Sequence, residues 1–421
     1  MSEANGELGY KEVLEKYPHV PKFVTLKIDA AIRGAILTER AFERARESNA
    51  VFEDVVEDQG RLVQRRSIAG AVLRDGTHLC RVSAESEGPR NTLTRGEPYT
   101  IDVVDGKLQL VDNGEPVEEV FFATIPEYYG KKTSRGTPMH RVVHAGPPDS
   151  LNISVYGFCY FWQQKHPCHY CTRAQQTKGK TEAELEDIVE TLDEALREQG
   201  KWTAFRLIAG SDPGGSSPYE NEANEYVRVL SALRRSFGSK GIPARLVASA
   251  IPREQLERLA EAGATTYEPH IEVWDEKLWE RICPGKAKYF GRKFWINNAI
   301  DAVKVFGRGN VCSQLVGGAE LAQPYGFKTI DEAIESDLQG VEFFAQHGVT
   351  TSLTILWVQP GSVFYKEKQR PAPLEYYVRL ASGMRDIRRK YNLAADFNDY
   401  RRCAIHPDTD LSRLDYPEFV N

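Results

Sequence analysis

From residue 150 onward, the sequence alternates between short buried-strand patterns and amphipathic helical patterns. We predict strands at residues 151–157, 204–210, 244–250, 265–273, 310–318 and 350–358. We predict helices at residues 181–199, 224–237, 253–263, 292–307, 330–348 and 373–391. Strict alternation requires parallel strands joined by crossover helices, so the fold class is α/β. The pattern fits either an open doubly wound sheet or a partial or complete (β/α) TIM-type barrel. The first predicted strand is not followed by a G-x-G-x-x-G motif, which argues against a dinucleotide-binding fold.

The first 150 residues have a different character. Residues 1–50 carry apolar side chains at helical intervals, and the stretch "DAAIRGAILTERAFERARE" is predicted to be helical. Between residues 51 and 150, short alternating runs are separated by turn residues, and "VVDGKLQLV" is a hairpin signal because Asp-Gly suits a tight turn. We expect a helical and β-rich accessory region at 1–150, a barrel at 151–392 and a C-terminal tail at 393–421 that covers the barrel.

Composition narrows the class of protein. The formal charge of −6 argues against a nucleic-acid partner, which normally requires a basic surface. No run of about 18 apolar residues is present, so we expect no membrane partner. The acidic start of the chain lacks the layout of a secretory signal, and the expected location is therefore cytoplasmic.

Three of the seven cysteines lie within "YGFCYFWQQKHPCHYC", directly after the first predicted strand. Loops at the C-terminal ends of barrel strands build active sites. Cys168 and Cys171 form a C-x-x-C pair that can reach one metal centre together, and Cys159 precedes them by eight intervening residues. Three thiolates are one short of the four that usually hold a four-iron cluster, which would leave one iron open to a small chelating molecule.

The spacing alone leaves other interpretations open. A zinc site with three cysteines and either His166 or His169 fits the same stretch. Thiols without any metal are a further possibility, because short C-x-x-C matches occur by chance.

The order of several motifs favours one interpretation. "PCHYCTRAQQ" after the first strand resembles the cluster-binding loop of the radical S-adenosylmethionine (radical SAM) enzymes, and it is most similar to the branch containing biotin synthase. "LIAGSDPGG", "EPHIEVWDEKLWERICPGK", "SQLVGGAEL" and "TILWVQPGSVF" resemble later elements of that superfamily in the same order. The resemblance covers about residues 150–390, although the usual loop has three residues between its first two cysteines where this chain has eight.

The resemblance implies a barrel of radical SAM kind with a set of site residues. Cys159, Cys168 and Cys171 would hold a [4Fe–4S] cluster, which makes the protein oxygen-sensitive. The residues implied in S-adenosylmethionine binding are Tyr170, Gly210, Ser211, Asp212, His270, Glu272, Arg292, Gln314 and Gly317. Several of them have a structural alternative: a carboxylate such as Glu272 can pair with a cation, a histidine such as His270 can be a satisfied core residue, and a helical arginine such as Arg292 can be solvated.

The remaining thiols divide into two groups. We expect Cys80 and Cys312 to be small buried hydrophobic residues. Cys283 and Cys403 are candidate catalytic thiols or ligands of a second cluster, and no other catalytic residue is predicted.

The resemblance also implies chemistry and partners. A flavodoxin- or ferredoxin-type donor would reduce the cluster, S-adenosylmethionine would be cleaved to a 5′-deoxyadenosyl radical, and the radical would act on a small-molecule substrate. Two rival classes are a zinc-dependent hydrolase or deaminase that uses the same Cys/His group, and a metal-ribbon module that binds a protein partner. The zinc enzyme predicts a colourless protein, and the binding module predicts no spectral response to S-adenosylmethionine.

Overall fold

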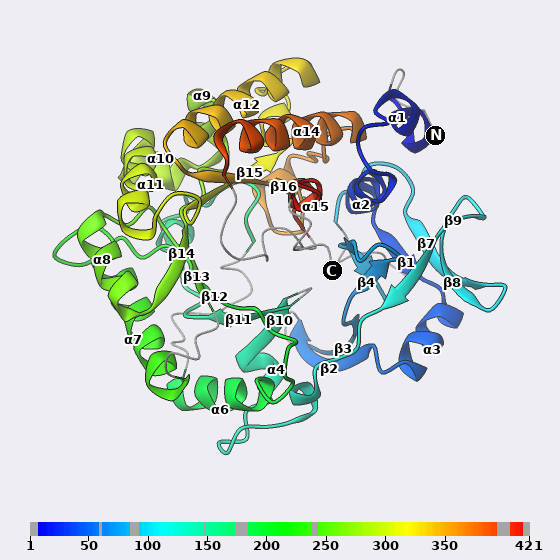
Figure 1. The fold of residues 1–421 in the computed structure, drawn as a ribbon, viewed down its shortest axis with the longest axis horizontal. Helices are drawn as coiled ribbons and strands as arrows, with labels where there is room; N and C mark the ends of the chain where they lie inside the picture. The colour runs from blue at the N-terminus through cyan, green and yellow to red at the C-terminus, as the bar shows by residue number, and fades with distance from the viewer. Residues whose placement is uncertain are drawn as a thin grey trace.

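The structure is a computed structural model that describes residues 7–58, 61–84, 92–146, 149–172, 184–237, 243–393 and 405–415. Six strands of the C-terminal part follow one another around a curved sheet (Figure 1). They are β11 (Ser150–Ser154), β12 (Ala204–Ile208), β13 (Ala244–Val247), β14 (Ala264–Glu268), β15 (Cys312–Gly317) and β16 (Thr350–Ile355). All neighbouring pairs are parallel, and bridges from Tyr267 to Val311 and from Glu272 to Leu315 join β14 to β15. One further strand, β10 (Val143–Gly146), pairs antiparallel with β11.

The crossover helices lie outside this sheet (Figure 1). They are α6 (Leu185–Ala195), α7 (Glu220–Phe237), α8 (Arg253–Ala262), α11 (Arg292–Phe306), α12 (Ile330–Gln346) and α14 (Leu374–Tyr391). The predicted alternation is therefore confirmed, and the fold is an α/β partial barrel. Two short helices that the periodicity did not predict, α9 (Glu276–Ile282) and α10 (Pro284–Tyr289), lie between β14 and α11.

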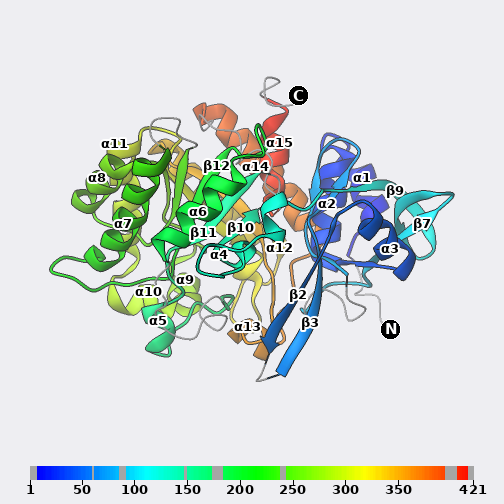
Figure 2. The ribbon, with the colours of Figure 1, turned by 90° about the horizontal axis from the view of Figure 1, so that it is seen from below.

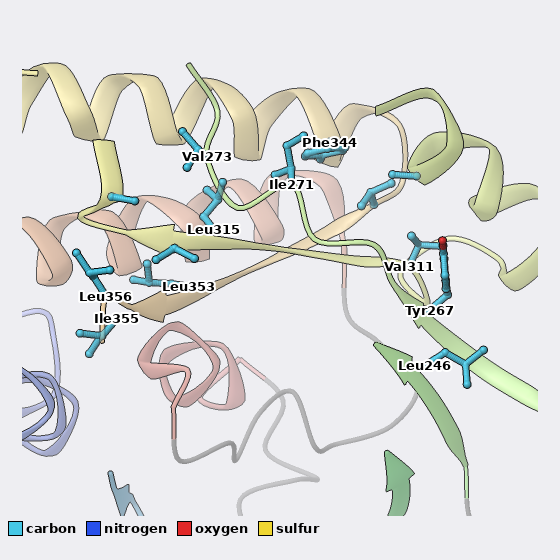
Figure 3. Close-up of a cluster of buried hydrophobic side chains, with 14 of the residues drawn as sticks. Leu246, Tyr267, Ile271, Val273, Val311, Leu315, Phe344, Leu353, Ile355 and Leu356 are labelled. Atoms are coloured by element: carbon cyan, nitrogen blue, oxygen red, sulfur yellow. The ribbon is translucent and has the colours of Figure 1, made fainter. Parts of the chain in front are cut away.

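The outer face of the sheet carries the main hydrophobic core (Figure 3). Leu315 on β15 and Leu353 on β16 are fully buried, and so is Phe344 of α12. Successive residues of a strand point to opposite faces of the sheet. Since Leu315 and Leu353 point outward to the helices, the residues that alternate with them point into the barrel. Those inward positions include charged and polar side chains, such as Arg206 on β12 and Arg245 on β13.

The observed strands are shorter than predicted at their C-terminal ends. The stretch predicted as a strand over 265–273 ends at Glu268, and Glu272 adopts a left-handed conformation with φ of 74°. Its backbone nevertheless stays bonded to β15, since its N–H donates to the Gln314 carbonyl at 2.9 Å and its carbonyl accepts from Val316 at 2.8 Å. The segment that follows β14 is thus bonded to β15 around Glu272, although it is no longer part of a regular strand.

The N-terminal region forms a second sheet of seven strands in the order β5-β4-β9-β8-β7-β1-β6. Its strands are β1 (Ala35–Leu37), β4 (Ala71–Leu73), β5 (His78–Leu79), β6 (Val82–Ser83), β7 (Tyr99–Val104), β8 (Lys107–Asp112) and β9 (Glu115–Phe122). The predicted Asp-Gly hairpin joins β7 to β8, with Asp105 and Gly106 both at positive φ. A separate hairpin of β2 (Val51–Asp58) and β3 (Arg61–Ile68) extends from this region (Figure 2).

The helical prediction for the first 50 residues was wrong at one point. The helices are α1 (Tyr10–Lys16), α2 (Lys22–Arg33) and α3 (Glu39–Glu47), and β1 interrupts the stretch predicted as one helix. Gly34, with φ of 82°, ends α2 because glycine tolerates this conformation. Shorter helical turns elsewhere are η1 (Glu127–Gly130), α4 (Met139–Val142), α5 (Tyr160–Gln163), η3 (Ala319–Leu321) and α13 (Val363–Lys366).

A last short helix, α15 (Pro407–Arg413), is buried along its whole length between α2, α14 and β16 (Figure 2). Asp410 pairs with Lys27 of α2, and Asp408 pairs with Arg388 of α14. Asp408 also accepts from the backbone N–H of Leu353 at 3.0 Å. Paired charges therefore join this segment to the N-terminal region and to the barrel. In the part of the chain that the structure describes, no helix is both long and apolar enough to cross a membrane.

Candidate active site

The loop that carries the three cysteines leaves the C-terminal end of β11 and is bonded to the ends of other strands. The Tyr160 N–H donates to the Ser211 carbonyl beyond β12 at 2.8 Å, and the His169 N–H donates to the Ile282 carbonyl of α9 at 2.8 Å. The Phe364 N–H donates to the His169 carbonyl at 2.9 Å. The loop is thus held across the end of the barrel where active sites of such folds lie.

Two glycines allow this close approach. A Cβ on Gly210 would lie 2.0 Å from the Phe158 carbonyl oxygen and 2.7 Å from Cβ of Cys159. A Cβ on Gly285 would lie 2.5 Å from the Phe161 ring. Gly210 was predicted to bind S-adenosylmethionine, and the structure places it directly against the first cysteine.

The three thiols are partly buried and close to one another. The Cys171 N–H donates to the Cys168 carbonyl at 3.0 Å, which folds the C-x-x-C pair into a turn. Burial raises the pKa of the Cys159 thiol, and the nearby Cys168 raises it further. Hydrogen bonds from the backbone amides of Trp162 and Ser211 act in the opposite direction and lower this pKa. Backbone amides that point at a sulfur would stabilise its thiolate form, which is the form that binds metal.

Cys283, predicted as a candidate catalytic thiol, lies next to the cysteine loop. Its thiol is within hydrogen-bonding range of Cys168, and this contact together with burial raises the pKa of Cys168 well above its usual value. Cys283 itself is fully buried at the start of α10. Cys403 lies outside the described residues. Cys312 is buried as predicted, with Sγ 3.5 Å from the Ser352 hydroxyl, whereas Cys80 is only partly buried.

A buried ion pair lies beside these thiols. The Lys286 ammonium donates to Oε1 of Glu272 at 3.2 Å and to the His270 carbonyl at 2.7 Å. Burial lowers the pKa of Lys286, but Glu272, Cys168 and Cys283 together outweigh burial, so the net shift of this pKa is upward. Tyr170 packs in the same place, since its pKa responds to the charges of both Cys168 and Glu272.

Ser211 and Asp212 meet a carboxylate that the sequence did not single out. Glu222, fully buried near the start of α7, accepts from the Asp212 N–H at 3.0 Å. It also accepts from the N–H and the hydroxyl of Ser249, at 2.7 and 2.9 Å, and the Ser249 hydroxyl lies 2.8 Å from that of Ser211. Burial raises the pKa of Glu222 to about 7. No sequence signal separates Glu222 from Glu220 and Glu225 on the same helix.

The other predicted site residues lie in three separate places. The Gln314 N–H donates to Nδ1 of His270 at 3.2 Å, which brings these two together inside the barrel. Arg292 donates to the Trp274 carbonyl at 2.6 Å and stacks on the Trp274 ring. The missing side chain of Gly317 would point at Leu353 and Tyr377, so that the space beside this glycine is filled by the core. Their roles in S-adenosylmethionine binding stay predictions.

The three thiols fit an iron–sulfur cluster in chemistry and placement. Soft thiolate ligands suit iron–sulfur clusters, and aromatic side chains pack around part of the loop. Tyr160 and Phe161 both pack against Tyr289 of α10, with ring centroids 5.2 and 5.8 Å apart. Within the ranges described above, no three His, Cys, Asp or Glu side chains form a group that would hold a single metal ion. Cys159, Cys168 and Cys171 would be the ligands of a cluster.

Comparison with known proteins shows which superfamily the segment with the cysteine loop resembles. Residues 154–321, which include the whole cysteine loop, match the radical SAM superfamily. A curated relative is the bacteriochlorophyllide c C-7(1)-hydroxylase of Chlorobaculum limnaeum, which is 22% identical over 321 residues, or 71% of this chain and 75% of the relative.

Similar solved structures include methylornithine synthase, with a TM-score of 0.41, 15% identity and coverage of 63% of this chain and 78% of that one. Another is a radical SAM methyltransferase from Sphaerobacter thermophilus, with a TM-score of 0.41, 12% identity and 94% of both chains covered.

Residues 154–321 therefore form a radical SAM domain, and this match together with the hydroxylase relative indicates that the protein is an enzyme. Members of this superfamily use a [4Fe–4S] cluster and S-adenosylmethionine, as the cysteine loop predicted. The affiliation to the biotin-synthase-like branch stays a prediction.

Proposed function

We propose that this enzyme reductively cleaves S-adenosylmethionine at a [4Fe–4S] cluster held by Cys159, Cys168 and Cys171, and that the resulting radical takes a hydrogen atom from a small-molecule substrate. The observation that carries the proposal is the match of residues 154–321, because this segment contains all three cysteines at the end of the barrel. When bound, the cluster supplies the electron that breaks a carbon–sulfur bond of S-adenosylmethionine and so yields methionine and a 5′-deoxyadenosyl radical.

The residues of the chain would bind and orient S-adenosylmethionine. Ser211 and Asp212 present polar groups beside the cysteine loop, and Glu222 holds the Asp212 backbone in place. Glu272 is near enough to Cys168 for its charge to act on that thiol, and its pairing with Lys286 fixes its position. We assign the ribose hydroxyls to Glu272 and the methionine amine to Asp212.

The substrate and the reductant belong to the proposal as well. The relative from Chlorobaculum limnaeum is named as a hydroxylase, and hydroxylation of carbon opens a C–H bond, which is the step that a 5′-deoxyadenosyl radical performs. We propose a flavodoxin- or ferredoxin-type protein as electron donor. We also propose that residues 1–150 and the tail 393–421 cover the barrel; the burial of α15 against α2 supports this arrangement.

The experiment is anaerobic reconstitution with iron and sulfide, followed by reduction with S-adenosylmethionine and measurement of 5′-deoxyadenosine. The wild-type protein is expected to form 5′-deoxyadenosine, and Cys168→Ala is expected to form none. A wild-type protein that holds a cluster and forms no 5′-deoxyadenosine contradicts the proposal. Formation of this product by Cys168→Ala would place the cluster on other ligands.

A further inference from the structure

A buried arginine of the N-terminal region lies against the end of the last barrel strand. Arg81, between β5 and β6, donates through Nη2 to the carbonyl of Leu356 at 2.6 Å, and Leu356 directly follows β16. The guanidinium also lies over the ring of Trp357, with Cζ 5.1 Å from the ring centroid. Only 6% of Arg81 is exposed. The N-terminal region thus places a buried cation at the C-terminal end of β16, which is the end of a barrel that carries active sites.

The segment after β16 also contacts the cysteine loop. Two residues beyond Trp357, the side-chain oxygen of Gln359 accepts from the Thr172 hydroxyl at 2.8 Å. Thr172 directly follows Cys171, the last of the three clustered cysteines. Because two residues of extended chain span at most about 7 Å, the Trp357 backbone is close to this contact. Arg81 therefore lies at the end of the barrel that the cysteine loop crosses.

Arg81 has no carboxylate partner among the residues that the structure describes. Besides burial, the groups that act on its pKa are Cys80 and Tyr377, and neither is a carboxylate. Burial lowers the pKa of Arg81 to about 10, so its guanidinium stays protonated near pH 7. Three other buried cations each pair with a carboxylate, namely Lys27, Lys286 and Arg388. A buried charge without such a partner is costly, so Arg81 calls for an anion.

Unsatisfied polar atoms gather at the same junction. Within the described part of the chain, Nη1 of Arg81, Nε1 of Trp357 and Oγ1 of Thr92 are buried without a hydrogen-bond partner. Thr92 is close by, because the N–H of the next residue, Leu93, donates to the Val358 carbonyl at 3.0 Å. Native proteins satisfy nearly all such groups, and all three atoms carry a hydrogen to donate. The junction thus offers several donors to a ligand with acceptor oxygens.

Charge distinguishes an anion from water as the missing partner. Ordered water could bond to the indole and the hydroxyl, but it would leave the guanidinium charge of Arg81 uncompensated inside the protein. A carboxylate supplies both the acceptor oxygens and one negative charge, and guanidinium groups bind carboxylates through paired N–H···O bonds. A phosphate monoester carries a charge of about −1.5 to −2 at pH 7, which would leave excess negative charge at a buried site. A carboxylate is therefore the ligand that fits.

We propose that Arg81, together with the indole N–H of Trp357, binds a carboxylate group of the substrate. Identification of this ligand as the substrate rests on the proposed function. Arg81 is nearly closed off from solvent and Trp357 is half-buried, so the carboxylate would enter past the exposed part of the indole ring. Its negative charge would complete the ion pair that Arg81 lacks.

The position of Arg81 also orients the substrate and gives the N-terminal region a task. The carboxylate would be held at the junction between the N-terminal region and β16, to one side of the barrel end. The rest of the molecule would then extend from this junction towards the cysteine loop. The substrate class is a carboxylic acid whose reacting carbon is remote from its acid group. The N-terminal region would thereby select the substrate, while the barrel carries the cysteines.

The experiment measures thermal unfolding of the anaerobic, cluster-loaded protein with simple probes. Sodium propionate is compared with propionamide, its neutral isostere, and with sodium chloride of equal ionic strength. We expect propionate in about tenfold excess over its Kd to raise the unfolding midpoint by about 2 °C, chloride to raise it less, and propionamide to leave it unchanged. The measurement needs neither reduction nor S-adenosylmethionine, so its outcome is independent of the 5′-deoxyadenosine assay.

A second arm identifies the source of the carboxylate, because S-adenosylmethionine carries one of its own. The propionate titration is repeated with saturating S-adenosylmethionine and without a reductant. We expect the propionate shift to persist, since the substrate and S-adenosylmethionine would bind together. Loss of the shift would assign Arg81 to the carboxylate of S-adenosylmethionine and would overturn the proposal.

Variants tie the effect to this arginine. Arg81→Met is expected to abolish the propionate shift and, without ligand, to unfold at or above the wild-type midpoint, because it removes a buried charge that lacks a partner. A clearly lower midpoint would make Arg81 a structural residue and contradict the proposal. Arg74→Met is the matched control with a full propionate shift, because Arg74 is exposed and pairs with Glu119 of the same sheet. Equal shifts with propionate and propionamide or chloride, a full shift in Arg81→Met, or a larger shift with inorganic phosphate would each overturn the proposal.

Discussion

Lys286 donates to Glu272 across 3.2 Å in the part of the molecule where the cysteine loop meets the end of β14. Both side chains are largely buried, and Lys286 also covers the Trp295 ring with its ammonium 4.2 Å from the ring centroid. Glu272 needs such a partner, because a buried carboxylate without one is costly. The ion pair thus places a carboxylate beside Cys168 and Cys283 at a backbone position that is itself left-handed.

Loss of this partner should destabilise the protein strongly. Lys286→Met leaves the Glu272 carboxylate uncompensated, and we expect the free energy of unfolding to fall by about 3–5 kcal/mol. Denaturant unfolding measures the change. Lys304→Met is the control, because Lys304 pairs with Asp301 on the surface and such pairs contribute about 1 kcal/mol or less. A loss in Lys286→Met no larger than that of the control would contradict the role of the pair.

A methyl group on Gly210 should disturb the cysteine loop. In Gly210→Ala the new Cβ meets the Phe158 carbonyl and Cys159, so the loop must shift, with a cost of about 1–3 kcal/mol. We expect less iron per chain after reconstitution and weaker visible absorbance. Gly130→Ala provides the comparison, since a Cβ there has no atom within 4 Å. Equal iron content in the two variants would show that the loop does not depend on this contact.

Glu222 should make stability depend on pH. Its pKa is raised by burial to about 7 in the folded state, compared with 4.5 for an ordinary glutamate. The folded state therefore binds more protons than the unfolded state between these values. Its contribution to stability is complete below about pH 4.5 and is lost as the pH rises through about 7. Relative to Glu222→Gln, the wild-type protein should lose about 3 kcal/mol between pH 4.5 and pH 8. Parallel pH profiles of the two proteins would contradict the raised pKa.

Cys283 should tune the cluster without holding it. We expect Cys283→Ala to keep the iron content of the wild-type protein, whereas alanine at Cys159, Cys168 or Cys171 lowers it. The Cys283 thiol lies within hydrogen-bonding range of Cys168, and donors to a ligand sulfur favour the reduced cluster. Removal of this donor should lower the reduction potential, which a redox titration followed by electron paramagnetic resonance measures. A Cys283→Ala protein without iron would make Cys283 a ligand.

Local pattern was enough to predict the main architecture. All six strands and all six crossover helices lie within or overlap the predicted ranges, because burial on the helix side imposes a periodicity on each segment that is visible without its neighbours. The sequence pattern did not reveal that β1 interrupts the helical stretch. Gly34 ends α2 because the chain turns there into the N-terminal sheet, and the partners of β1 in that sheet are distant in the sequence. Arg206 and Arg245 stand out in the sequence as charges within the apolar strands "AFRLIAG" and "ARLVASA", but no role was predicted for them.

By itself, the sequence determined the alternating α/β order and the three clustered cysteines, since both are properties of residues close together in the chain. Only the tertiary structure decided that Cys283 meets Cys168, that Glu222 supports Asp212, and that Glu268 is shared by two arginines. These contacts join residues from different strands and helices. Their distances depend on strand register and barrel curvature, which arise when all the segments pack at once.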